Sequence, residues 1–178
     1  MLDKLYITPR QWLHILRWFL YSLLLLFVMM LQTVVLGNRT MLGVHPHFVP
    51  IVIACVCLQE GPERGGLFAL LASVFWCLSG ADFGTVSIVM LTLVPVLGSV
   101  LCKALFANRF LPCLLVTLAT LLLEQSAIFL LKFIFGDMDG ILFLTELLPC
   151  VLVSMLAFVP VYFLVKSIEK IGDAYEST

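Results

Sequence analysis

Charged side chains are scarce in this sequence. Only 12% of the 178 residues are charged, 62% are hydrophobic, and the mean hydropathy is +1.15. A soluble globular domain carries roughly a quarter charged residues, so this chain could not cover a surface that faces water. The net charge of −1 comes with no basic patch, which argues against a nucleic-acid partner. The composition therefore predicts a membrane protein, with lipid around its long apolar stretches.

Motifs for catalysis and metal binding are also missing. The sequence contains no G-x-S-x-G, Walker loop, H-E-x-x-H or pair of catalytic carboxylates. Cys55 and Cys57 are spaced for neither a redox motif nor zinc, and all six cysteines lie in or beside apolar runs, as small hydrophobes do. His45 and His47 lack further ligands at metal spacing, so we interpret them as a solvated interfacial pair. We therefore expect that this protein is not an enzyme and that it has no catalytic residue, cofactor or metal site.

Apolar runs are abundant instead. Six candidate spans follow one another: Trp18–Leu36, Val44–Leu58, Gly65–Leu78, Phe83–Leu105, Phe110–Phe135 and Ile141–Val165. A helix rises 1.5 Å per residue and a bilayer core is about 30 Å thick, so the second and third spans are short. The prediction is an all-α bundle of six transmembrane helices, forming a single domain over residues 1–178. A re-entrant hairpin is the alternative for the two short spans, and we favour two complete ones.

The basic residues predict the orientation. If the N-terminus is inside, eight of them are cytoplasmic: Lys4, Arg10, Arg17, Arg64, Lys103, Arg109, Lys166 and Lys170. Only Arg39 and Lys132 then lie outside. Because cytoplasmic segments of membrane proteins are enriched in Lys and Arg, we expect residues 1–17 and 166–178 to be cytoplasmic in a multi-pass protein of the cell membrane.

A charged, glycine-rich stretch, "LQEGPERGGLF", interrupts the apolar sequence at residues 58–68. Gly61 and Pro62 break the helix, since proline lacks an amide hydrogen and glycine accepts unusual dihedral angles. Gly65 and the glycine after it would let the next helix start close against its neighbour. We predict a tight cytoplasmic turn, with a protein-binding or gating role for Glu60 and Arg64 as the alternative.

One carboxylate lies in the middle of a predicted span. Glu124 stands in "LLLEQSAIF", next to Gln125. A charge in lipid costs several kcal/mol, so such residues are functional candidates. Structural pairing between helices is the first interpretation, contact with a partner or ligand the second, and proton transfer the third. Lys132 lies about 12 Å further along the helix and could reach the outer interface.

Taken in order, five segments resemble the MreD family of bacterial rod shape-determining membrane proteins. They are "LQTVVLG", "GVHP", "EGPERGGLFALL", "FWCLSGADFG" and "LCKALFANRFLPCLLVTLATLLLEQ", and they span nearly the whole chain. The matching residues are Leu31-Gln32, Pro46, Arg64-Gly65, Ser79-Gly80 and Gly84. The family usually has a glycine and then an aspartate before the Ser-Gly pair, where this chain has Ala72 and Trp76.

The resemblance implies a non-enzymatic scaffold of the cell-wall elongation complex, which maintains cell shape. It implies MreC as the direct partner, with RodA and a class B penicillin-binding protein in the same complex and MreB filaments reached indirectly. The family fold is similar to the S subunits of energy-coupling-factor vitamin transporters, which supplies the alternative function. Against that alternative, the first helix lacks the pair of alanines four apart with which such subunits dock. The candidate partner-contacting or cavity-lining residues are Gln32, Glu60, Arg64, Trp76, Glu124 and Gln125.

Overall fold

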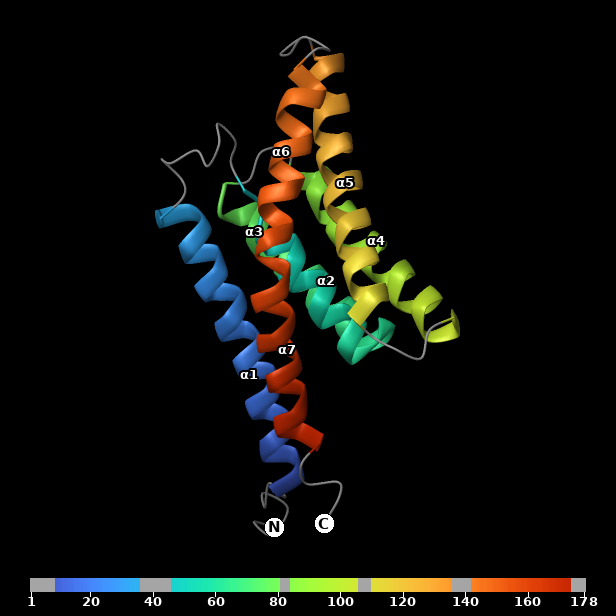
Figure 1. Cartoon of the computed structure of the whole chain (residues 1–178). Coiled ribbons are helices and arrows are strands. Elements are labelled where there is room, and N and C mark those ends of the chain that lie inside the picture. The colour runs from blue at the N-terminus through green and yellow to red at the C-terminus, as the bar shows by residue number, and fades with distance from the viewer. Residues whose placement is uncertain (1–8, 36–45, 81–83, 106–109, 136–141, 174–178) are drawn as a thin grey trace.

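The computed structural model describes residues 9–35, 46–80, 84–105, 110–135 and 142–173 (Figure 1). The elements are α1 (Pro9–Met30), the π-helical segment η2 (Leu31–Val35), α2 (Val49–Glu60), α3 (Pro62–Leu78), α4 (Gly84–Leu105), α5 (Phe110–Ile134), α6 (Leu142–Leu156) and α7 (Phe158–Asp173). No strand occurs among these residues. The predicted all-α class is confirmed.

Among the described residues, three helices are long and apolar enough to cross a membrane. They cover Trp12–Val34, Gly84–Cys102 and Phe110–Ile134, and α6 with α7 makes a fourth if that bent pair is one span. Many large apolar side chains of these helices point away from the protein, among them Phe19, Phe27, Leu93, Leu97, Leu130 and Phe163. This pattern suits a multi-pass membrane protein, because lipid covers such surfaces. The predicted count of six crossings is not confirmed and stays a prediction.

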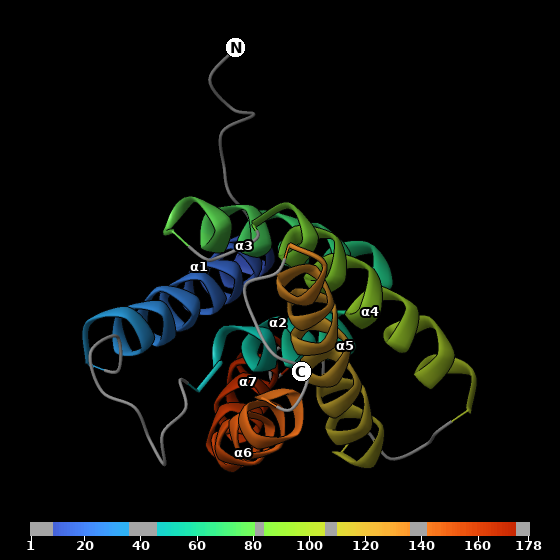
Figure 2. The ribbon, with the colours of Figure 1, turned by 90° about the horizontal axis from the view of Figure 1, so that it is seen from above.

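Helix α2 lies at the centre of the bundle (Figure 2). It packs against α1, α3, α4, α5 and α7, and every residue from Val49 to Cys57 is buried. A helix that is apolar on all sides needs protein or lipid around it, and the neighbouring helices supply that environment for α2. At 12 residues α2 is about 18 Å long, shorter than a bilayer core.

The stretch between α2 and α3 forms the predicted tight turn. Gly61 has φ +88°, a left-handed conformation that favours glycine, and its N–H donates to the Cys57 carbonyl. Pro62 opens α3 at a position where no amide hydrogen is needed. A Cβ on Gly65 would lie 2.5 Å from the Cys57 Cα, so the two helices are in backbone contact there. The prediction that the helix after the turn, α3, starts close against its neighbour α2 is therefore confirmed.

The last predicted span, Ile141–Val165, is not one straight helix. It is broken after Leu156 and bends by 42° between α6 and α7. Pro160 explains the break, because its ring crowds the carbonyl of Leu156 and it has no amide hydrogen to donate. The helices also run further than predicted, since α1 begins at Pro9 and α7 continues to Asp173. Helical structure therefore reaches into both segments that we expect to be cytoplasmic.

Candidate functional site

Side chains of α1 and η2 hold both ends of the central helix α2. Their buried residues follow the helical spacing i, i+4, i+7, i+8, i+11 and form one face: Tyr21, Leu25, Val28, Met29 and Gln32. Arg17 lies one turn before Tyr21 and meets the C-terminal end of α2. Gln32 closes the face and meets the start of α2.

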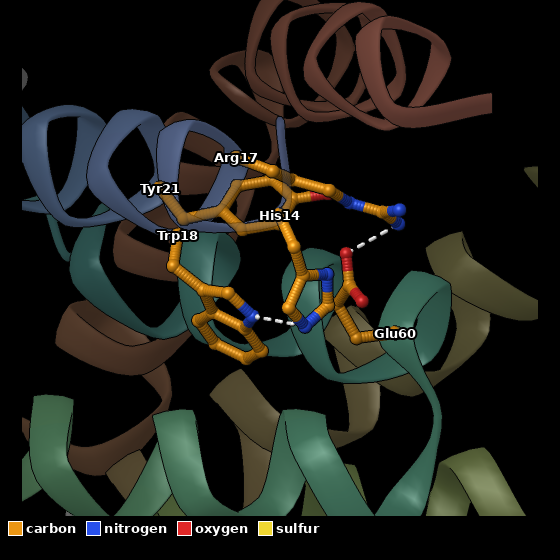
Figure 3. Close-up of polar contacts among 5 residues, drawn as sticks. All are labelled: His14, Arg17, Trp18, Tyr21 and Glu60. Atoms are coloured by element: carbon orange, nitrogen blue, oxygen red, sulfur yellow. Dashed lines mark hydrogen bonds and ion pairs between the residues drawn. The ribbon is translucent and has the colours of Figure 1, made fainter. Parts of the chain in front are cut away.

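An ion pair joins Arg17 to Glu60 at the C-terminal end of α2 (Figure 3). The side chains are only 13% and 4% exposed, so the pair is shielded from water. The Arg17 Nε also donates to the Tyr21 hydroxyl at 3.4 Å, and the guanidinium lies 6.0 Å from the centre of the Tyr21 ring. The positive charge of Arg17 is thus compensated by the Glu60 carboxylate, the Tyr21 hydroxyl and the face of the Tyr21 ring.

Aromatic rings extend this contact to α3. The Trp18 indole N–H donates to the His14 Nε2 at 3.3 Å, and both side chains lie beside Arg17 in Figure 3. The rings of Trp18 and Tyr21 lie 6.1 and 6.3 Å from the Phe68 ring of α3. We call His14, Arg17, Trp18, Tyr21 and Glu60 the Arg17 cluster. With Phe68 it ties α1, α2 and α3 together.

The N-terminal end of α2 lies inside the protein, so the first backbone N–H groups of the helix need hydrogen-bond acceptors there. The Gln32 Oε1 accepts hydrogen bonds from the N–H groups of Phe48, at 2.9 Å, and Val49, at 3.3 Å. The N–H of His47 donates to the Ser154 hydroxyl oxygen of α6 at 2.9 Å. Three successive backbone donors are satisfied in this way, as a buried helix start requires. His47 is half-buried, whereas we expected a solvated residue; His45 lies outside the described residues.

Two thiols mark the contact of α2 with α5. The Sγ atoms of Cys55 and Cys113 are 3.6 Å apart, and both cysteines are free and buried. No pattern in the sequence indicates this contact, because the two residues are 58 positions apart. It fixes which face of α5 is turned toward α2.

A polar stripe continues along that face of α5. Cys113, Thr117, Thr120 and Glu124 follow at helical spacing and are all buried. Glu124 is 1% exposed, and its Oε2 has no hydrogen-bond partner. The Nε2 of the neighbouring Gln125 is also buried without one. The predicted structural pairing of Glu124 is thus not seen among the described residues.

The six candidate residues do not form a single site. Gln32 and Glu60 hold opposite ends of α2, while Glu124 and Gln125 lie on α5. Trp76 is buried in the core of the bundle. Arg64 is exposed, and the carboxylate of Glu60 pairs with Arg17 instead.

Two important residues, Arg17 and Ser154, were not among the candidates. From the sequence, Arg17 is predicted only to be one of the cytoplasmic basic residues, although its spacing of four from Tyr21 is a weak signal that both side chains share a face. Ser154 has no sequence signal, since its partner His47 is 107 residues away.

Within the part of the chain that the structure describes, no three His, Cys, Asp or Glu side chains are grouped so that they could hold a metal ion. No protein-family model, curated protein or solved structure matches this chain.

Proposed function

We propose that this chain is a non-enzymatic membrane scaffold of the bacterial cell-wall elongation complex, similar to MreD, that binds MreC and helps to maintain cell shape. One observation carries the proposal. Several residues behind the family resemblance build the α2–α3 hairpin and its attachment to η2. A scaffold requires such structural roles.

Gln32, in the Leu31-Gln32 pair, caps α2. Gly65, in the Arg64-Gly65 pair, permits backbone contact between α3 and α2. Gly80 has φ +94° at the end of α3. A Cβ on Gly84 would collide with the Cys77 side chain, so this glycine lets α4 start against α3.

The proposal includes six crossings of the cell membrane with both ends in the cytoplasm. It rests on eight basic residues against two in the predicted cytoplasmic and outer segments. The start of α1 and the end of α7 lie at the same end of the bundle in Figure 1, as an even number of crossings requires. Whether α2 and α3 cross as two short helices or re-enter does not alter this parity.

Affinity purification from native membranes tests the scaffold function. The tagged chain, extracted in mild detergent, should co-purify MreC, together with RodA and a class B penicillin-binding protein. A Gly65→Leu variant, which separates α3 from α2, should lose these partners, whereas a variant of the exposed Glu63, Glu63→Gln, should keep them. Recovery of the intact elongation complex without this chain would refute the proposal.

An S subunit of an energy-coupling-factor vitamin transporter is the second candidate. The observation that favours it is the pair of buried, unpartnered polar atoms on Glu124 and Gln125, because small-molecule pockets place a few polar groups in an apolar lining. In the same purification this function would recover ATPase subunits instead of MreC. A vitamin would also raise the unfolding temperature by binding only the folded state.

A further inference from the structure

Glu124 carries a buried carboxylate oxygen that has no hydrogen-bond partner among the described residues. Its side chain is 1% exposed, and the Oε2 accepts no hydrogen bond. An unpaired charge inside a membrane bundle is strongly disfavoured, and an unsatisfied buried polar atom points to an occupant that is absent from the polypeptide itself.

The helices that pack on α5 carry no suitable basic residue. They are α2, α4 and α6, together with α7, whose Phe158 and Tyr162 rings contact Phe110 at the start of α5. The sequences of α2 and α6 contain no Lys, Arg or His. The basic residues of α7 follow Tyr162, and Lys166 lies over the Tyr162 ring at 5.7 Å, near the start of α5 rather than near Glu124. In α4 the one basic residue, Lys103, stands two residues before the end that leads into α5, whereas Glu124 lies about 21 Å along α5 from its start. On α5 itself Lys132 is about 12 Å further on.

The other titratable groups near these helices do not supply a countercharge either. Those on α2, α4 and α6 whose side chains are described are Cys55, Cys57, Glu60, Cys102 and Cys150. Glu60 is paired with Arg17 at the far end of α2, and the rest are thiols. His47, just before α2, has contacts of its own.

The face of α5 that carries Glu124 presents acceptors. Thr120 lies four residues before Glu124, about one helical turn, and Thr117 lies seven residues before it, about two turns. Both threonines are buried. Their hydroxyl groups donate to backbone carbonyls of α5, both at 2.7 Å, to Cys113 and Val116. The hydrogens are therefore used. The Thr117 hydroxyl also lies against the Cys55 thiol, whereas the lone pairs of the Thr120 oxygen remain for a ligand.

We propose that Glu124, with the Thr120 hydroxyl oxygen one turn away, binds a small monovalent cation inside the bundle. Carboxylate and hydroxyl oxygens suit a hard cation. One carboxylate neutralises one positive charge, whereas a divalent ion would leave a net charge in a medium of low dielectric constant. The Oε2 is buried, which favours a small ion over the long basic side chain of another protein.

Thermal unfolding of the purified full chain in lipid nanodiscs tests the site. The unfolding temperature is measured in lithium, sodium, potassium and ammonium chloride and in N-methylglucamine chloride, all at one ionic strength. At least one small cation should raise it relative to N-methylglucamine, on the order of 5 °C at a hundredfold excess over the Kd. Glu124→Gln should abolish this increase and Thr120→Val should weaken it, whereas Glu63→Gln, at an exposed carboxylate, should retain it.

Equal unfolding temperatures in all five salts would overturn the proposal, and so would a cation effect that survives in Glu124→Gln. If Glu124→Gln does not fold, infrared spectroscopy of the unmodified chain tests whether a cation replaces the proton on the carboxyl group. The band of the protonated carboxyl group should weaken when the small cation replaces N-methylglucamine. A band that is unchanged in every salt, or that weakens only when a lysine-containing partner peptide is added, would also overturn it.

Discussion

At the scale of single residues, the shielded Arg17–Glu60 ion pair joins α1 to the end of α2. Buried ion pairs contribute little net stability, because desolvation offsets the attraction between the charges. Removal of one partner is different, since it leaves the other charge buried and uncompensated. The pair therefore acts mainly on specificity: it aligns the end of α2 with one position on α1.

Glu60→Leu should lower the free energy of unfolding by about 3 kcal/mol, because Arg17 then stays buried without a carboxylate. The double variant Arg17→Met/Glu60→Leu should recover most of this loss. Titration with sodium dodecyl sulfate measures both. Glu63→Leu, at an exposed position three residues further on, should change the stability little. A double variant as unstable as Glu60→Leu alone would contradict this account of the pair.

Gln32 is the second residue with a specific structural role, because its side-chain oxygen accepts hydrogen bonds from two amides at the start of α2. Gln32→Leu should cost about 1–2 kcal/mol, as the loss of other helix caps does. The control is Thr33→Val, where the lost hydroxyl bonds only to the Met29 carbonyl of its own helix. Similar losses in both variants would mean that the capping contact is not important for stability.

At the scale of elements, glycines set the distances between helices. Gly65 lies against the backbone of α2, while its neighbour Gly66 faces the Val96 side chain of α4, which a Cβ would approach to 3.0 Å. Backbone atoms cannot move aside without shifting a helix, whereas a side chain can adjust slightly.

Gly65→Ala should therefore destabilise the protein more than Gly66→Ala, although both changes add one methyl group to the same helix. We expect a loss of about 2 kcal/mol or more for the first and less than half of that for the second. Thermal unfolding of the two purified variants gives the comparison. An equal effect, or a larger one for Gly66→Ala, would show that α3 can move away from α2 at little cost.

At the scale of the whole molecule, the hairpin of α2 and α3 determines where the turn near Gly61 lies. Glu60 meets Arg17 in the N-terminal half of α1, so the turn lies toward the end of the bundle where α1 begins and α7 ends (Figure 1). The turn and both chain ends should then be on the same side of the membrane.

A cysteine introduced by Glu63→Cys should react with a membrane-impermeant maleimide in inside-out vesicles and be protected in intact cells. The unmodified chain, with its six native cysteines, provides the background. Labelling of Glu63→Cys from outside the cell would contradict both the predicted cytoplasmic turn and the orientation derived from the basic residues.

Much of the architecture could be predicted from the sequence. Apolar runs indicated the helices, and Gly61-Pro62 indicated the turn. Pro160 also stands in the sequence, but prolines are tolerated in transmembrane helices, so the pattern alone did not tell a bend from a straight span. For the site, Gln32 and Glu60 were chosen as candidates, yet their partners, the start of α2 and Arg17, could not be inferred, because a local pattern does not report contacts between distant segments.

The sequence by itself determined that this chain needs an apolar environment and folds into helices, since its composition leaves no other way to bury its surface and satisfy its backbone. Only the tertiary structure decided that α2 is enclosed on all sides and that α1 and η2 hold both its ends. It also decided that the Glu124 Oε2 is buried without a hydrogen-bond partner among the described residues. The reason is physical: composition and periodicity fix which residues avoid water, whereas packing fixes which of them meet.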